Sequence, residues 1–259
     1  MTTRGLFKKA EEDLENYAGM RLPICLCLDV SGSMRHRVDA NDIRSNFKIA
    51  ELNRGIQEFY QELQNDEITR YTAEVAIVTF GGNEKTGKFT EVKTVRDFSR
   101  VEIQGSAPVL EAYGYTPIGE AVNQALDLLE KRKEQYKEYG NTYYRPWLVI
   151  MSDGRPEGHS ESELIRAKQR VQQYYKEKKV VPISVSIGKV DSVAQKHLRE
   201  IGGGCFLSMN NRKFLEFFRW LHKSVSSSVG NDVDVLLEEL LSNAKIWYDE
   251  DFIKNKGLG

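Results

Sequence analysis

The chain has little cysteine, little histidine and almost no net charge. Only three cysteines and four histidines occur in 259 residues. The histidines are scattered without the spacing of metal ligands, and the thiols are too few for paired ligation. The 37 basic residues nearly balance the 38 acidic ones. Because binding to phosphates needs a concentrated basic surface, this balance argues against nucleic acid as the main partner.

Long hydrophobic runs are also missing. No run reaches the roughly 18 apolar residues that span a bilayer, and the first 20 residues lack the apolar stretch of a secretion signal. With 29% charged residues and a mean hydropathy of −0.51, we expect a soluble protein without a membrane segment. Cys25 and Cys27 lie two apart on a predicted strand, and Cys205 is the third cysteine. We interpret all three as buried thiols of a cytoplasmic protein.

What the chain does contain is an alternation of apolar, strand-like segments and amphipathic, helix-like segments. Such an alternation predicts a Rossmann-like, doubly wound α/β fold, with a mostly parallel central sheet and helices on both faces. Gly81-Gly82 should end the second strand, and Ile43 and Ile165 should face inward on their helices. The strands are expected over 22–28, 73–80, 88–93, 147–151, 180–187 and 205–208, and the helices over 43–63, 118–134, 162–178, 193–201 and 214–225.

Two terminal segments lie outside this alternation. Residues 1–20 contain a weak amphipathic pattern and are expected to form an N-terminal helical extension. Residues 21–229 would form the domain itself. Residues 230–259 would form a C-terminal helix, over 233–247, followed by a loose polar tail.

Five oxygen-bearing side chains occur at points where the sequence predicts the ends of strands or the start of a helix. Asp29, Ser31 and Ser33 follow the first strand, and Asp153 follows the fourth. Thr116 directly precedes a helix that should begin at a proline, which is favoured at the first helical position. Because parallel sheets bind ligands beyond the carboxyl ends of their strands, these side chains should converge. An oxygen set of this kind suits a hard divalent cation.

The pattern Asp-x-Ser-x-Ser, then Thr, then Asp, resembles the metal-ion-dependent adhesion site of von Willebrand factor A (VWA) domains. The resemblance covers approximately residues 21–228 and implies a VWA fold. It also implies that Ser31, Ser33 and Thr116 bind the ion directly and that Asp29 and Asp153 act mostly through water. The ion would be Mg²⁺, or Mn²⁺ or Ca²⁺, and an Asp or Glu of a protein partner would complete its shell.

Within the VWA proteins, three stretches look most like the bacterial tellurite-resistance-associated group. They are Leu-Asp-Val-Ser-Gly-Ser-Met, Thr-Pro-Ile-Gly-Glu-Ala and the run from Arg145 to Gly154. This resemblance implies an adaptor in a bacterial stress-response or defence complex. Its partner could be an ATPase, a kinase or a phosphatase that is encoded nearby.

Five residues beside these motifs are weaker candidates for contact with a partner. Basic residues could steer an acidic partner towards the ion, and tyrosines could form an aromatic rim. Ordinary surface charge and a solvated histidine are the alternatives. The candidates are Arg35, His36, Tyr113, Tyr115 and Arg155.

Three alternatives to the binding module remain open. The motifs could be plain turns and helix caps. The chain could be a magnesium-dependent phosphohydrolase with Asp29 as nucleophile, although Ser31 stands where that chemistry needs a second acid. The terminal helices could instead recruit a larger machine. Because neither a phosphate-binding Walker loop nor a Gly-x-Ser-x-Gly motif occurs, we expect no enzyme.

Overall fold

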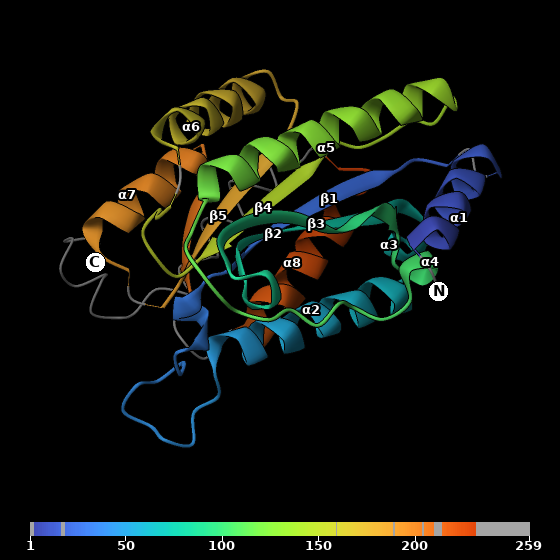
Figure 1. Cartoon of the computed structure of the whole chain (residues 1–259). Coiled ribbons are helices and arrows are strands. Elements are labelled where there is room, and N and C mark those ends of the chain that lie inside the picture. Colours follow the sequence, from blue (N-terminus) through green and yellow to red (C-terminus); the bar gives the residue numbers. More distant parts are fainter. Residues whose placement is uncertain are drawn as a thin grey trace, which may run out of the picture.

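The computed structural model describes residues 3–16, 19–158, 160–188, 190–203, 205–209 and 214–231. They form a central six-stranded sheet between two layers of helices (Figure 1). The strand order is β3-β2-β1-β4-β5-β6, in which only β3 runs antiparallel. The strands are β1 (Leu22–Val30), β2 (Ala73–Asn83), β3 (Lys88–Arg100), β4 (Trp147–Ser152), β5 (Val181–Ile187) and β6 (Phe206–Met209).

Helices cover both faces of the sheet, so the predicted fold class is confirmed. One face packs against α5 (Ile118–Glu138), α6 (Glu161–Lys176) and α7 (Ser192–Ile201). The other packs against α2 (Lys48–Asn65) and α8 (Phe214–Ser228). The remaining elements of the described part are helix α1 (Thr3–Asn16) and four short elements: η1 (Gly32–Arg35), α3 (Thr69–Thr72), η2 (Glu84–Thr86) and α4 (Val101–Gln104).

Strand β1 lies in the centre of the sheet and is buried on both faces. Ile24 and Leu26 belong to the core under α2 and α8, whereas Cys25 and Cys27 belong to the core under α5. This alternation explains why the strand reads as a continuous apolar run. It also places both thiols on one face, as predicted, and burial raises the pKa of each thiol.

The order of the strands reverses at β1, which pairs with β2 on one side and with β4 on the other. In doubly wound sheets, ligands bind outside the carboxyl ends of the strands at this point. Asp29 is the next-to-last residue of β1, and Asp153 directly follows β4. The fold therefore brings the motifs to the edge that the sequence predicts.

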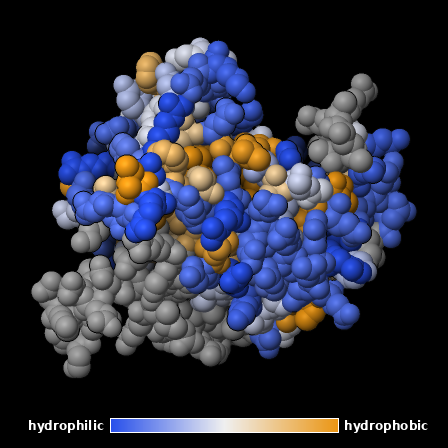
Figure 2. Space-filling model, turned by 90° about the horizontal axis from the view of Figure 1, so that it is seen from below, coloured by the Kyte–Doolittle hydropathy of each residue, from blue (hydrophilic) through white to orange (hydrophobic). Residues whose placement is uncertain are grey.

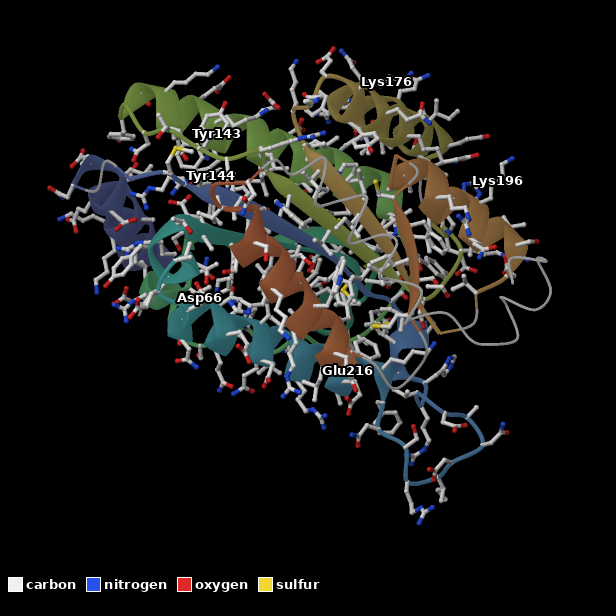
Figure 3. All side chains as sticks on the ribbon, turned by 180° about the vertical axis from the view of Figure 1, so that it is seen from behind. Asp66, Tyr143, Tyr144, Lys176, Lys196 and Glu216 are labelled. Atoms are coloured by element: carbon white, nitrogen blue, oxygen red, sulfur yellow. The ribbon has the colours of Figure 1, made fainter. Side chains whose placement is uncertain are left out.

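Helices α2 and α8 lie side by side on their face of the sheet (Figure 3). Asp66, directly after α2, accepts a hydrogen bond from Ser226 of α8 at 3.0 Å. Seen from below, the side on which α2 lies, the surface is mainly hydrophilic with small hydrophobic patches (Figure 2). No helix in the described ranges is long and apolar enough to cross a membrane.

The predicted start of the first helix in the domain is wrong. Helix α2 begins at Lys48, and Ile43, which we expected on its buried face, is 81% exposed. The residues before the helix form a projecting loop that is closed by a short antiparallel pairing of Arg37 with Phe47. Ile165 on α6 is also not buried, since it is 48% exposed.

The two glycines at 81 and 82 do not end β2, which continues to Asn83. A Cβ atom at Gly81 would lie 2.6 Å from the carbonyl oxygen of Val30, and one at Gly82 would lie 2.9 Å from Cα of Gly114. These glycines therefore permit close approach of neighbouring backbones within a strand. Because β2 continues to Asn83, β3 pairs with it from Lys88 onward. At its other end, β3 follows β2 back to the pairing of Arg100 with Glu74, well beyond the short strand that we predicted.

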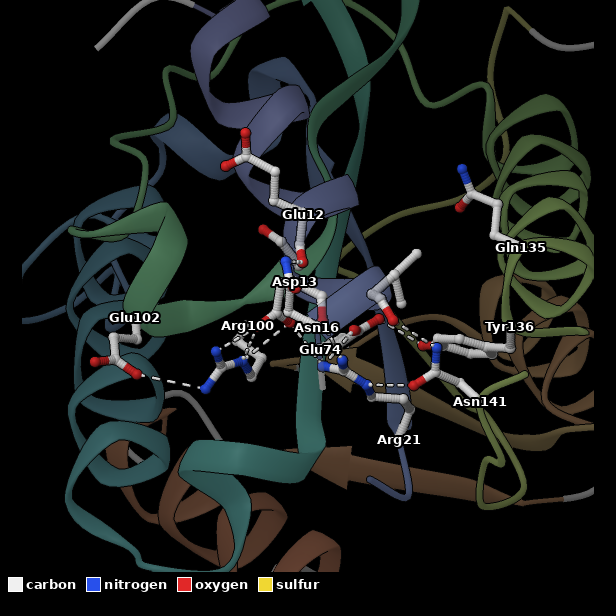
Figure 4. A network of polar contacts seen from close by, with 12 residues as sticks. Glu12, Asp13, Asn16, Arg21, Glu74, Arg100, Glu102, Gln135, Tyr136 and Asn141 are labelled. Atoms are coloured by element: carbon white, nitrogen blue, oxygen red, sulfur yellow. Dashed lines mark hydrogen bonds and ion pairs between the residues drawn. The ribbon is translucent and has the colours of Figure 1, made fainter. Parts of the chain in front are cut away.

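Helix α1 is bound to the amino-terminal end of the sheet by buried charges (Figure 4). Asp13 on this helix pairs with Arg21 at 2.7 Å and also with Arg100. Arg21 is fully buried and pairs with Glu74 at 3.3 Å, and Glu74 in turn pairs with Arg132 at 2.7 Å. The helix that we predicted over 233–247 lies outside the described residues.

Candidate metal centre

Asp29 stands one residue before the end of β1, and its carboxylate is fully buried. Its Oδ1 accepts a hydrogen bond from the backbone N–H of Ser31 at 2.7 Å. Its Oδ2 accepts one from the hydroxyl of Ser152 at 2.6 Å. Both oxygens are thus held by neighbours, one in the same loop and one on the adjacent strand β4.

Two of the candidate hydroxyls and the second carboxylate form a chain of contacts. Oγ of Ser31 lies 2.9 Å from Oγ of Ser33, which donates to Oδ1 of Asp153 at 2.5 Å. The side chain of Asp153 is buried. Residues that are 120 positions apart in the sequence therefore share one polar cluster, as predicted from the parallel sheet.

The loop that carries Thr116 is hydrogen-bonded to the loops on both sides of it. The N–H of Thr116 donates to the carbonyl oxygen of Glu157 at 3.0 Å, four residues after Asp153. The carbonyl oxygen of Gly114 accepts from the N–H of Gly32 at 2.8 Å. These bonds bring the three motif loops together at one edge, with Thr116 buried between them.

The carboxyl groups of Asp29 and Asp153 lie close enough to repel each other when both are ionised. Burial, together with the nearby negative charge of Asp153, raises the pKa of Asp29 to about 7. Hydrogen bonds from Ser152 and Ser31 counteract only part of this effect. A cation at this edge would relieve the repulsion between the carboxylates.

The cluster also contains a cation that the sequence motifs do not indicate. The ammonium group of Lys48 lies 2.6 Å from Oδ2 of Asp153 and donates to it. Nothing local in the sequence marks Lys48, because it is one lysine among many and stands at a helix start that we placed incorrectly. Only the tertiary fold brings it to Asp153. Ser152 was missed for the same reason.

The donor set fits a hard divalent cation. All five candidate side chains offer oxygen, as Mg²⁺, Mn²⁺ and Ca²⁺ prefer, and a lysine ammonium already balances one of the carboxylates. Among the described residues, no group of three or more His, Cys, Asp or Glu could hold a metal ion. A site here would therefore depend on hydroxyls as well as carboxylates.

The two arginines that we predicted as partner contacts already bind other residues of this chain. Nε of Arg35 donates to the carbonyl oxygen of Ala112 at 2.6 Å, and its guanidinium group pairs with Glu84. Arg155 pairs with Asp191, the N-cap residue of α7. His36 is exposed. Both arginine side chains remain about half exposed, so their free N–H groups are accessible to an acidic protein.

An aromatic rim borders the cluster, formed by Phe89, Tyr113 and Tyr115. The Phe89 ring stacks with both tyrosines, at centroid distances of 5.4 Å to Tyr113 and 5.5 Å to Tyr115. Phe89 is 53% exposed and Tyr115 is 45% exposed. The sequence indicated the two tyrosines, but not Phe89 on β3. Tyr115 of this rim directly precedes Thr116 in the sequence.

The family described as von Willebrand factor type A domain matches residues 24–155, more than half of the chain. No curated protein matches. Among solved structures, the chain is similar to the PilB minor pilin from Streptococcus sanguinis, with 12% identity and a TM-score of 0.60 over 82% of this chain and 64% of that one. It is also similar to the vWF domain of the type V pili tip protein Mfa5 from Porphyromonas gingivalis, with 9% identity and a TM-score of 0.55 over 82% and 97%.

A third similar structure is the pilus adhesin SpaC from Lactobacillus rhamnosus GG. It has 12% identity and a TM-score of 0.55, and the match covers 82% of this chain and 31% of that one. Identities this low show a shared fold. The chain spans just under two thirds of the pilin and about a third of this adhesin.

Proposed function

The chain belongs to the von Willebrand factor type A domain family, and on that premise we propose that it is a metal-dependent protein-interaction module. Five residues would hold a divalent cation, Mg²⁺ or else Mn²⁺ or Ca²⁺. They are Asp29, Ser31, Ser33, Thr116 and Asp153. The observation that carries this proposal is the partly buried chain of contacts from Ser31 through Ser33 to Asp153.

The chemistry of the ligands explains why such an ion would bind a partner. Hydroxyl groups contact a cation without neutralising it, and carboxylates that act through water neutralise it only in part. The ion then supplies a positive charge at the protein surface, where a carboxylate from another protein is the complementary ligand. We therefore propose that the partner contributes an Asp or Glu to the ion.

The aromatic rim supplies a second contact for the same partner. Exposed aromatic rings are enriched at protein interfaces because they bury a large apolar area. We propose that the partner carries an apolar side chain next to its acidic residue and that this side chain packs on Phe89 and Tyr115. Tyr113, Arg35, His36 and Arg155 would border the contact.

The alternative, a phosphohydrolase with Asp29 as nucleophile, has less support. A nucleophilic carboxylate must reach the phosphorus atom, but Asp29 is fully buried and both of its oxygens accept hydrogen bonds. We therefore propose that the chain is not an enzyme. Magnesium-dependent hydrolysis of p-nitrophenyl phosphate by the pure protein, lost in Asp29→Asn, would reverse this conclusion.

We propose an adaptor in a bacterial stress-response or defence complex, of the tellurite-resistance-associated kind, beside an ATPase, kinase or phosphatase. The three cysteines are buried free thiols, which supports a cytoplasmic location. We also propose that residues 21–229 form the binding domain, with 1–20 and 230–259 as extensions.

Magnesium binding tests the ion site. A ligand that binds only the folded state stabilises it, so millimolar Mg²⁺ should raise the thermal midpoint relative to a chelator. Thr116→Ala should abolish this rise, and Thr86→Ala, at an exposed threonine in η2, should retain it. A wild-type midpoint that does not respond to Mg²⁺ or Mn²⁺ would refute the site.

Partner capture tests the binding role. A protein retained by the immobilised chain in Mg²⁺ should be released by chelator, and it should not bind Thr116→Ala. Once the partner is identified, replacing its contacting Asp or Glu by Asn or Gln should abolish retention. A partner that binds equally well with chelator would show that the metal is not part of the interface.

A further inference from the structure

The contact between Lys48 and Asp153 places a positive charge inside the candidate metal centre. Nζ of Lys48 lies 2.6 Å from Oδ2 of Asp153. The lysine side chain is only 15% exposed, and that of Asp153 is not exposed at all. The other oxygen of the same carboxylate accepts the hydroxyl of Ser33. Lys48 therefore contacts the same ligand cluster that the ion would use.

The backbone fixes this lysine at the metal centre. Lys48 is the first residue of α2, and its N–H donates to the carbonyl oxygen of His36 at 3.0 Å, three residues after Ser33. The pairing of Arg37 with Phe47 closes the loop directly before it. The start of α2 is thus held against the loop that carries two of the candidate hydroxyls.

A lysine at the first position of α2 does not stabilise the helix. The amino-terminal end of a helix carries a partial positive charge, so a cation in its first turn is destabilising by a few tenths of a kcal/mol up to about 1 kcal/mol. The contact with Asp153, across 105 residues of sequence, offsets this effect. The ion pair with Asp153, and not the helix, therefore favours a lysine at this position.

We propose that Lys48 is an internal competitor of the divalent cation for Asp153. This inference rests on the proposed ion site. The ammonium group balances the buried carboxylate when no ion is bound, and ion binding releases Lys48 from Oδ2. An ion that reaches Asp153 through water would still lie within several ångströms of the Lys48 ammonium group. Like charges repel strongly at a largely buried site, so each cation weakens the binding of the other. The competition lowers the affinity for the ion.

Calorimetric titration with MgCl₂ and MnCl₂ tests the competition. Lys48→Met and Lys48→Gln remove the charge, and the glutamine retains a hydrogen-bond donor for Asp153. Both variants should bind the ions about tenfold more tightly than the wild type, or better. Lys48→Arg should keep the wild-type affinity. Arg44→Met, which removes an exposed cation from the neighbouring loop, is the matched control and should change nothing.

Lysine acetylation followed by mass spectrometry tests the release itself. Lys48 should react faster with acetic anhydride in Mg²⁺ than in chelator, whereas the exposed Lys196 should react equally in both. Equal or weaker ion binding by both uncharged variants, or a Lys48 that reacts no faster with Mg²⁺, would overturn the competition and leave the ion site standing. If neither the wild type nor any folded variant bound either metal, the ion site and the competition would both be wrong.

Discussion

The hydroxyl of Ser152, the last residue of β4, donates a hydrogen bond to Oδ2 of Asp29, near the end of β1, at 2.6 Å. Both side chains are fully buried. The bond joins the two strands at the point where the sheet order reverses. It makes Ser152 a positioning residue for the candidate metal centre.

Ser152→Ala should lower the free energy of unfolding by about 1–3 kcal/mol, because a buried carboxylate loses a hydrogen-bond donor. It should also weaken Mg²⁺ binding near neutral pH, since that bond favours the ionised form of Asp29. Urea denaturation and calorimetry measure the two effects. Ser186 on β5 pairs in register with Ser152, but its hydroxyl donates a hydrogen bond to Ser208. Ser186→Ala is the control and should leave ion binding unchanged.

Ion binding should depend on pH through Asp29. Burial raises the pKa of this carboxyl to about 7, so the folded protein holds the proton more tightly than the unfolded chain does. Without an ion, the stability that this proton contributes is fully present below about pH 4 and is lost as the pH rises through 7. A divalent cation needs the ionised carboxylate. The rise in thermal midpoint with Mg²⁺ should therefore be small at about pH 6 and full at about pH 8.

Two measurements check this pH dependence. The midpoint of the ion-free protein should fall between these pH values more steeply in the wild type than in Asp29→Asn, which cannot ionise. The response of the wild type to Mg²⁺ should grow over the same interval. A response to Mg²⁺ of constant size from pH 6 to 8 would contradict the assignment of Asp29 to the ion site.

Gly119, in the first turn of α5, lets this helix approach α6 closely. A Cβ atom at this position would lie 2.6 Å from both Cα and N of Leu164, which are backbone atoms of the neighbouring helix. Gly119→Ala should therefore destabilise the fold by about 1–3 kcal/mol despite the better helix propensity of alanine. Gly154→Ala, which would approach only Oγ of Ser33 at 3.9 Å, should have a smaller effect on denaturant unfolding. Equal stability of Gly119→Ala and the wild type would show that α5 and α6 pack less closely.

Asp13 binds helix α1 to the sheet through Arg21 and Arg100 (Figure 4). Burial alone would raise the pKa of Asp13, but hydrogen bonds from the two arginines outweigh it and hold the pKa below its usual range. Asp13→Asn should reduce stability at pH 7 by about 3 kcal/mol, because the fully buried Arg21 loses a charged partner.

The effect of Asp13→Asn should also depend on pH. The contribution of a carboxyl with a lowered pKa is complete above the unfolded value near 4 and is lost as the pH falls through the folded value. The stabilities of variant and wild type in urea should therefore converge towards about pH 2. Glu12→Gln, on the exposed side of the same helix, is the control and should behave like the wild type throughout.

The aromatic rim predicts a variant that separates partner binding from ion binding. Phe89→Ala removes the ring between Tyr113 and Tyr115 without touching the oxygen cluster. Affinity for the magnesium-dependent partner should fall about tenfold or more, as expected for an aromatic residue central to an interface. The affinity for Mg²⁺ should stay at the wild-type value. Unchanged partner affinity would place the contact elsewhere on this edge of the sheet.

The fold and the convergence of three motifs could be predicted because both depend on local patterns. A strand that is buried on both faces reads as a continuous apolar run, and a parallel sheet brings the ends of β1 and β4 to one edge. Lys48, Ser152 and Phe89 could not be assigned to the site, because each reaches it through tertiary packing from a segment without a motif. The end of β2 was predicted incorrectly because glycine is usually depleted within strands. Here Gly81 and Gly82 lie inside the strand, where close contacts with neighbouring backbones require glycine.

Crystals soaked in MnCl₂ provide the most direct test of the central claim. We predict one strong anomalous peak at the carboxyl end of β1, with oxygens of Ser31, Ser33 and Thr116 about 2.0–2.6 Å from the metal. We also predict that Lys48 no longer contacts Asp153 in that structure. A manganese-loaded crystal without a peak at this position, or with a peak that these three hydroxyls do not contact, would contradict the account.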